Sequence, residues 1–98
     1  MGRYFAERLA AEIERELAEI LSYEAEDERL QGVVVLRVEV SGPRAVVFYA
    51  VEGVSWAEAD RALRRAARFL RARLKEELGL QVVPRLEFVP EEAEWTDF

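Results

Sequence analysis

The chain contains neither cysteine nor histidine. The absence of cysteine excludes disulfides, thiolate nucleophiles and thiolate metal sites. The absence of histidine removes the commonest metal ligand and the usual acid–base group at neutral pH. The five glycines are scattered, so no glycine-rich phosphate loop is present. We therefore expect a recognition protein without cofactor or metal, and an enzyme working through carboxylates is the weakest alternative.

Long apolar segments are also missing. No hydrophobic run approaches the roughly 20 residues that a membrane span requires, and no basic-then-apolar signal segment opens the chain. A length of 98 residues suits one domain, and 51% hydrophobic with 35% charged residues is typical of a folded globule. We expect a cytoplasmic monomer with one domain over residues 1–90 and an acidic, flexible tail over residues 91–98.

The net charge of −6 conceals a strong separation of charge along the chain. Glu7–Glu28 holds nine acids and two arginines, whereas Arg61–Lys75 holds seven basic residues and no acid. The last eight residues hold four acids and no base. Such asymmetry points to a charged partner more clearly than the net charge does.

The hydrophobic pattern predicts two helices. Apolar residues recur at three- and four-residue steps between Tyr4 and Ser22, among strong helix formers. Trp56–Leu78 is helical by propensity, with Ser55 and Glu58 at capping-box spacing and Gly79 as the terminator.

Three strands complete the pattern. Val33–Val40 and Ala45–Val51 are rich in β-branched residues and flank a Ser-Gly-Pro-Arg turn signal, which predicts a hairpin. Gln81–Val89 is the third strand, and Pro84 confines it to an edge or a bulge.

A helical projection of Trp56–Leu78 separates apolar from basic residues, because each residue advances by about 100°. Leu63, Leu70, Leu74 and the neighbouring alanines share the arc that faces the sheet. The opposite side carries the group that we call the basic stripe: Arg61, Arg64, Arg65, Arg68, Arg71 and Lys75. Six like charges on one face repel one another, and this costs stability.

Three interpretations of the basic stripe remain open at this point. It is a solvated face whose arginines cover apolar surface or pair with the acids of the first helix, a surface that binds nucleic-acid phosphates, or a docking site for an acidic protein. Arg37 and Arg85 on the strands are candidates to assist phosphate binding. The sheet aromatics Tyr49, Phe48 and Phe88 could stack on bases, but core packing is the favoured interpretation.

The order of these segments resembles the ribosome-binding factor A family. Arg8–Leu30 (RLAAEIERELAEILSYEAEDERL) resembles the opening helix of the family, and Val38–Ser41 matches its usual Val-Glu-Val-Ser. Leu63–Val89 is similar to its helix–kink–helix and final strand, including the Val-Pro-x-Leu-x-Phe segment at Val83–Phe88. The resemblance covers about residues 8–90.

The resemblance implies an α+β, type-II KH-like fold of order α-β-β-α-kink-α-β, with helices packed on one face of a three-stranded sheet and no GXXG loop. It implies a non-enzymatic assembly factor that binds the 30S ribosomal subunit and 16S rRNA, and assists rRNA processing and cold-adapted growth. It also places an interhelical kink at Ala66, Ala67 and Arg68, where the family has Ala-x-Gly. These three residues favour a straighter helix, so the sequence leaves the kink open.

Overall fold

The computed structural model describes residues 3–92 and confirms the predicted α+β order. One helical turn, η1, extends the first helix, and a short 3₁₀ segment, η2, precedes the sheet. In chain order the elements are α1 (Arg3–Glu19), η1 (Ile20–Glu24), η2 (Glu28–Gly32), β1 (Val33–Ser41), β2 (Arg44–Val51), α2 (Trp56–Leu78) and β3 (Arg85–Pro90).

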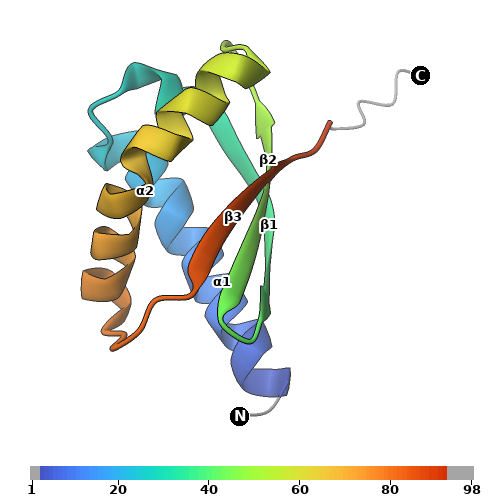
Figure 1. Cartoon of the computed structure of the whole chain (residues 1–98), viewed down its shortest axis with the longest axis vertical. Helices are drawn as coiled ribbons and strands as arrows, with labels where there is room; N and C mark the ends of the chain where they lie inside the picture. Colours follow the sequence, from blue (N-terminus) through green and yellow to red (C-terminus); the bar gives the residue numbers. More distant parts are fainter. Residues whose placement is uncertain (1–2, 93–98) are drawn as a thin grey trace.

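The three strands form one sheet in the order β1-β2-β3. β1 and β2 are an antiparallel hairpin, as predicted, whereas β3 returns through α2 to pair parallel with β2. Both helices lie on the same face of the sheet (Figure 1). Ala45, Val47 and Tyr49 alternate along β2 toward the helices and are buried. Within residues 3–92 no helix covers the opposite face, which we call the open face of the sheet (Figure 1).

The core lies between this sheet and the two helices. Ile13 and Leu17 of α1 are fully buried, and so are Leu70 and Leu74 of α2. Burial of each such side chain contributes roughly 1.5–3 kcal/mol relative to its exposed state. This apolar packing turns one side of α2 inward, which leaves its other side in solvent.

Local signals set both ends of α2. Ser55 Oγ accepts a hydrogen bond from the Glu58 backbone N–H at 3.1 Å, and Glu58 Oε1 accepts from the Ser55 N–H at 2.9 Å. The hydrogen bond from the Ser55 backbone N–H is the main cause of the lowered pKa of the Glu58 carboxyl. Gly79 ends the helix at φ 63°, a conformation that glycine adopts without a Cβ penalty. The predicted bounds of this helix are confirmed.

The kink implied at Ala66, Ala67 and Arg68 does not divide α2. The segment Trp56–Leu78 is one uninterrupted α-helix, although its axis changes direction about half-way along (Figure 1). Two alanines and an arginine are strong helix formers, so the backbone hydrogen bonds continue through the bend. The helix is therefore curved rather than broken.

The third strand begins later than predicted. β3 starts at Arg85 rather than Gln81, because Pro84 has no backbone N–H to donate to a ladder. The Arg85 N–H then donates to the Pro43 carbonyl at 2.8 Å and opens the pairing. Beyond the strand, the Glu91 N–H donates to the Tyr49 carbonyl at 2.8 Å. Residues 93–98 of the predicted tail lie outside the described residues.

Candidate nucleic-acid interface

The basic stripe is exposed along its whole length. All six of its side chains face solvent on α2, on the side away from the buried Leu63, Leu70 and Leu74. The sequence-based projection placed them there because a residue three or four positions from another lies on the same side of a helix. The structure confirms this part of the prediction.

The stripe is almost free of internal ion pairs. Within residues 3–92, Arg64 is the one stripe residue that forms a salt bridge, and its Nε lies 3.0 Å from Asp60 Oδ2. Both side chains are more than half exposed, and such pairs contribute little to stability. Arg71 donates instead to the Val83 backbone carbonyl at 3.1 Å. No stripe residue pairs with an acid of α1 in the described chain, so the predicted pairing with the first helix is wrong.

Arg73, the basic residue outside the stripe, behaves differently. Its Nε lies 2.7 Å from Glu24 Oε1 and its Nη2 lies 2.7 Å from Glu77 Oε1, while Nη1 contacts Glu76. Hydrogen bonds to Glu24 and Glu77 raise the pKa of this guanidinium. Arg73 therefore has a structural role that its stripe neighbours lack.

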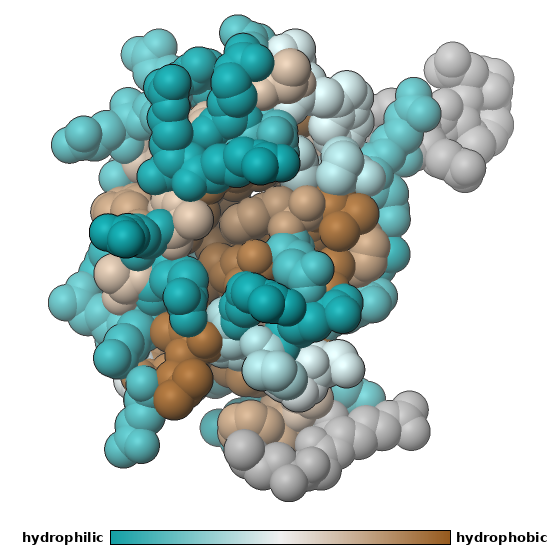
Figure 2. Space-filling model, in the orientation of Figure 1, coloured by the Kyte–Doolittle hydropathy of each residue, from teal (hydrophilic) through white to brown (hydrophobic). Residues whose placement is uncertain are grey.

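Three arginines meet at a groove between α2 and β3. Arg64, Arg71 and Arg85 line this hollow of about 360 Å³, together with apolar side chains from both elements. Figure 2 shows apolar surface in the region between the helix and the strand, framed by hydrophilic residues. The structure thus places Arg85 beside two members of the basic stripe.

Arg37 lies apart from this surface. It is on the open face of the sheet, where its guanidinium stands 3.9 Å from the centre of the Phe48 ring. It also pairs with Glu91 at 2.7 Å and with Glu39 at 3.3 Å. Glu91 is the main cause of the raised pKa of Arg37. Because α1 and α2 cover the other face, Arg37 does not extend the basic stripe.

Of the sheet aromatics, Tyr49 and Phe88 belong to the core or pack against it, whereas Phe48 lies under Arg37 on the open face. Tyr49 is fully buried and makes edge contacts with Trp56 and Phe88, at ring-centre distances of 5.7 and 6.3 Å. Phe69 on α2 is 39% exposed and was not among the residues predicted to bind nucleic acid. The sequence signal for Phe69 was its position on the helical projection of α2, outside both the apolar and the basic arcs.

Neither a cluster of metal ligands nor a membrane-spanning helix is found in the described residues. Residues 3–92 contain no group of three or more acidic side chains placed to hold a metal ion. Over the same residues, no helix is long and apolar enough to cross a membrane. What the surface does offer is a row of guanidinium groups, which bind phosphate oxygens through charge-assisted and bidentate hydrogen bonds.

Comparisons with known proteins point to one family. The family model described as ribosome-binding factor A matches residues 5–95. A ribosome-binding factor A from Methylobacillus flagellatus is 42% identical over 88 residues, which span 86% of this chain and 69% of that protein.

Solved structures show the same fold. The crystal structure of ribosome-binding factor A from Thermus thermophilus aligns with a TM-score of 0.75 and 34% identity, covering 87% of this chain and 94% of that one. A homology model of the Thermus thermophilus factor, fitted into a cryo-EM map of its 30S complex, aligns with a TM-score of 0.63 and 32% identity, over 86% and 97% of the chains. The KH-like fold and the family model agree, and the chain belongs to the ribosome-binding factor A family.

Proposed function

We propose that this protein is a non-catalytic, cytoplasmic assembly factor that binds the free 30S subunit through 16S rRNA during late maturation and rRNA processing. The observation that carries the proposal is the exposure of all six basic-stripe side chains, of which Arg64 alone pairs with a carboxylate in the described chain. The Thermus thermophilus relative fitted into a 30S map supports the choice of partner.

The physical mechanism is electrostatic docking on the RNA backbone. Each guanidinium that reaches a phosphate releases condensed counterions, which makes the binding favourable at low salt and weaker at high salt. The Arg64–Asp60 pair is solvent-exposed, so Arg64 exchanges its carboxylate for a phosphate at little cost. Arg85 adds a cation across the groove from Arg64 and Arg71. We propose the basic stripe with Arg85 as the phosphate-binding surface.

The test is co-sedimentation with purified 30S subunits across a salt series. Arg61→Ala combined with Arg68→Ala removes two positive charges from the stripe, and the matched control Arg8→Ala with Arg15→Ala removes two from α1. We expect the stripe variant to lose roughly tenfold or more in affinity and the control to stay within about twofold. Equal losses in both would show that only net charge matters.

The same series separates RNA from an acidic protein partner. Protein-free 16S rRNA is substituted for the subunit, and its affinity is measured at each salt concentration. Salt-dependent binding that weakens in the stripe variant supports rRNA docking. If the protein binds the 30S subunit but not protein-free 16S rRNA, the stripe binds a ribosomal protein and not the RNA. Absence from the subunit fraction even at low salt would refute the proposal.

A further inference from the structure

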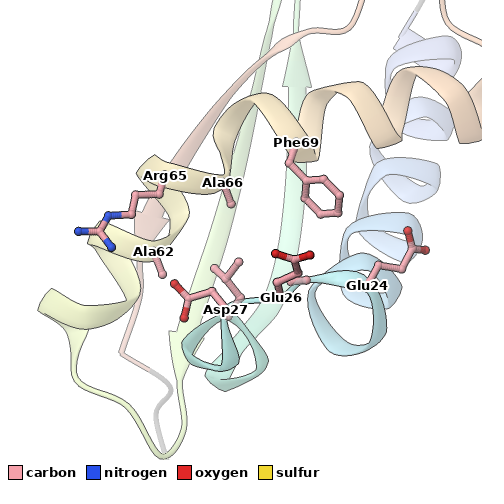
Figure 3. Close-up of a pocket in the computed structure, with 9 residues that line it drawn as sticks. Glu24, Glu26, Asp27, Ala62, Arg65, Ala66 and Phe69 are labelled. Carbon is pink, nitrogen blue, oxygen red and sulfur yellow. The ribbon is translucent and has the colours of Figure 1, made fainter.

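A second hollow lies on the other side of α2, facing the connection that follows α1. It encloses about 390 Å³, within the roughly 300–1,000 Å³ usual for small-ligand sites. Ala62, Ala66 and Phe69 of α2 line this hollow, together with the buried Leu30 of the 3₁₀ segment. Figure 3 shows the Phe69 ring directed toward the carboxylates that come from the connection. One wall is therefore apolar and the other is acidic.

The three carboxylates of the acidic wall have different environments. Glu24 accepts from Arg73 at 2.7 Å, and Asp27 accepts from Arg29 Nε and Nη2 at 3.0 and 2.9 Å. These arginines fix two of the acids in place. Glu26 has no hydrogen bond or ion pair within residues 3–92, although it lines the same hollow. It is the acceptor that this hollow presents to an incoming molecule.

The hollow adjoins the basic stripe. Arg65 belongs to the stripe and also lines the hollow, and its guanidinium points outward from it (Figure 3). Arg61 and Arg68 precede and follow Arg65 by four and three positions, so they are its neighbours on the helix surface. An RNA strand held along the stripe passes the mouth of the hollow.

We infer that this hollow binds an unpaired guanine base of the RNA that the stripe holds, an inference that rests on the proposed function. A base is planar and has apolar faces, which suit the alanines and the exposed Phe69 ring. Phosphate is excluded by the acids of the opposite wall and stays on Arg65. The base of a nucleotide would therefore lie in the hollow while its phosphate stays on the neighbouring basic stripe.

The choice of guanine follows from the chemistry of Glu26. An ionised carboxylate accepts hydrogen bonds and donates none. Guanine presents two adjacent donors, N1–H and the N2 amino group, which match the two oxygens of a carboxylate. Adenine and cytosine present one amino group beside an acceptor nitrogen, and uracil presents one N–H between two carbonyls. The acceptor-only wall therefore favours guanine over the other three bases.

The test uses the full chain with single-stranded uridine oligonucleotides of equal length that carry one central guanine, adenine or inosine. Fluorescence anisotropy at fixed salt should give about tenfold tighter binding of the guanine oligonucleotide than of the adenine one. Inosine, which lacks the N2 amino group, should fall between them. Glu26→Gln should bring the three affinities within about twofold. The matched control Glu28→Gln, on the same connection but outside the hollow, should retain the preference.

Phe69→Ala is the second arm, because it removes the aromatic face without changing charge. We expect it to weaken binding of the guanine oligonucleotide by roughly fivefold or more, and to leave an oligonucleotide abasic at that position unchanged. Tyr23→Ala, an exposed aromatic outside the hollow, is the control. Circular dichroism checks that each variant is folded.

The outcomes distinguish this inference from the proposed function. If stripe variants weaken all oligonucleotides while wild type shows no guanine preference, the hollow is not a base site and the docking function stands. If the stripe variants bind oligonucleotides and 30S subunits as tightly as wild type does, the proposed function itself fails. A lysine-rich peptide that shifts the amide NMR signals of Glu26 and Phe69, where RNA does not, would also overturn the inference.

Discussion

Arg73 Nε on α2 donates to Glu24 Oε1 over 2.7 Å, which joins the C-terminal half of that helix to the end of the segment that extends α1. The two residues are 49 positions apart in the chain. Glu77, one turn further along α2, binds the same guanidinium. The result is an ion-pair clasp between two helical segments on the same face of the sheet (Figure 1). Arg73 comes from the same basic run as the stripe, but it stabilises the fold.

Arg73→Ala should therefore lower the free energy of unfolding while leaving RNA binding nearly unchanged. The substitution leaves the Glu24 and Glu77 carboxylates without their cation. Its effect should be smaller than that of Leu74→Ala, a fully buried neighbour whose truncation costs about 2–5 kcal/mol. Urea unfolding measures the stability, and 30S co-sedimentation measures the binding. A stability equal to wild type would show that the clasp contributes nothing.

Arg68→Ala should produce the reverse result. Arg68 is exposed on α2 and has no partner within residues 3–92, so its removal costs little stability. If it contacts one phosphate, the slope of log affinity against log salt should decrease by about one. Both substitutions remove one positive charge from the same helix. Parallel binding losses in Arg68→Ala and Arg73→Ala would contradict a specific stripe.

Acid should destabilise the connection after α1 through Asp27. Hydrogen bonds from the Arg29 side chain, with a further one from its backbone N–H, lower the pKa of this carboxyl below its ordinary value of 3.8. Because the folded pKa is lower than the unfolded one, the stabilising contribution is complete above the unfolded pKa. It disappears as the pH falls through the folded pKa.

Asp27→Asn tests this linkage. The variant should be less stable than wild type at neutral pH, because the amide does not form the charged pair with Arg29. Its stability should then decline less than that of wild type between about pH 4 and pH 2. Denaturant unfolding at a series of pH values measures both quantities. Identical declines in the two proteins would place the acid sensitivity elsewhere, for example at Glu58 of the helix cap, whose pKa is also lowered.

Gly32 should not tolerate a side chain. A Cβ at this position would lie 2.7 Å from the Glu52 carbonyl oxygen and 2.7 Å from Val54 Cγ2. The Glu52 N–H also donates to the Gly32 carbonyl at 2.8 Å, which holds the two backbones together. Gly32→Ala should therefore cost about 1–3 kcal/mol in thermal or urea unfolding. The exposed neighbour substitution Gln31→Ala should stay within about 0.5 kcal/mol of wild type.

Many features of this protein were determined by local sequence alone. The spacing of apolar residues and the capping box of Ser55 and Glu58 predict the observed bounds of α2. The helical period of about 3.6 residues also predicts that the side chains of the basic stripe face solvent. The hairpin followed from two β-branched runs around one turn. Local patterns suffice for these features because each depends on residues within one or two turns of the chain.

Only the tertiary structure decided which charged groups meet. No periodic pattern links Arg73 to Glu24, places Arg37 over Phe48, or opens a hollow between α2 and the residues around Glu26. The change in direction of the uninterrupted α2 likewise occurs without a glycine or proline in the helix (Figure 1). Such contacts join segments distant in sequence, and their geometry depends on how whole elements pack. The sequence shows where the basic residues lie along the chain. The packing decides which of them form ion pairs within the fold and which remain exposed to a partner.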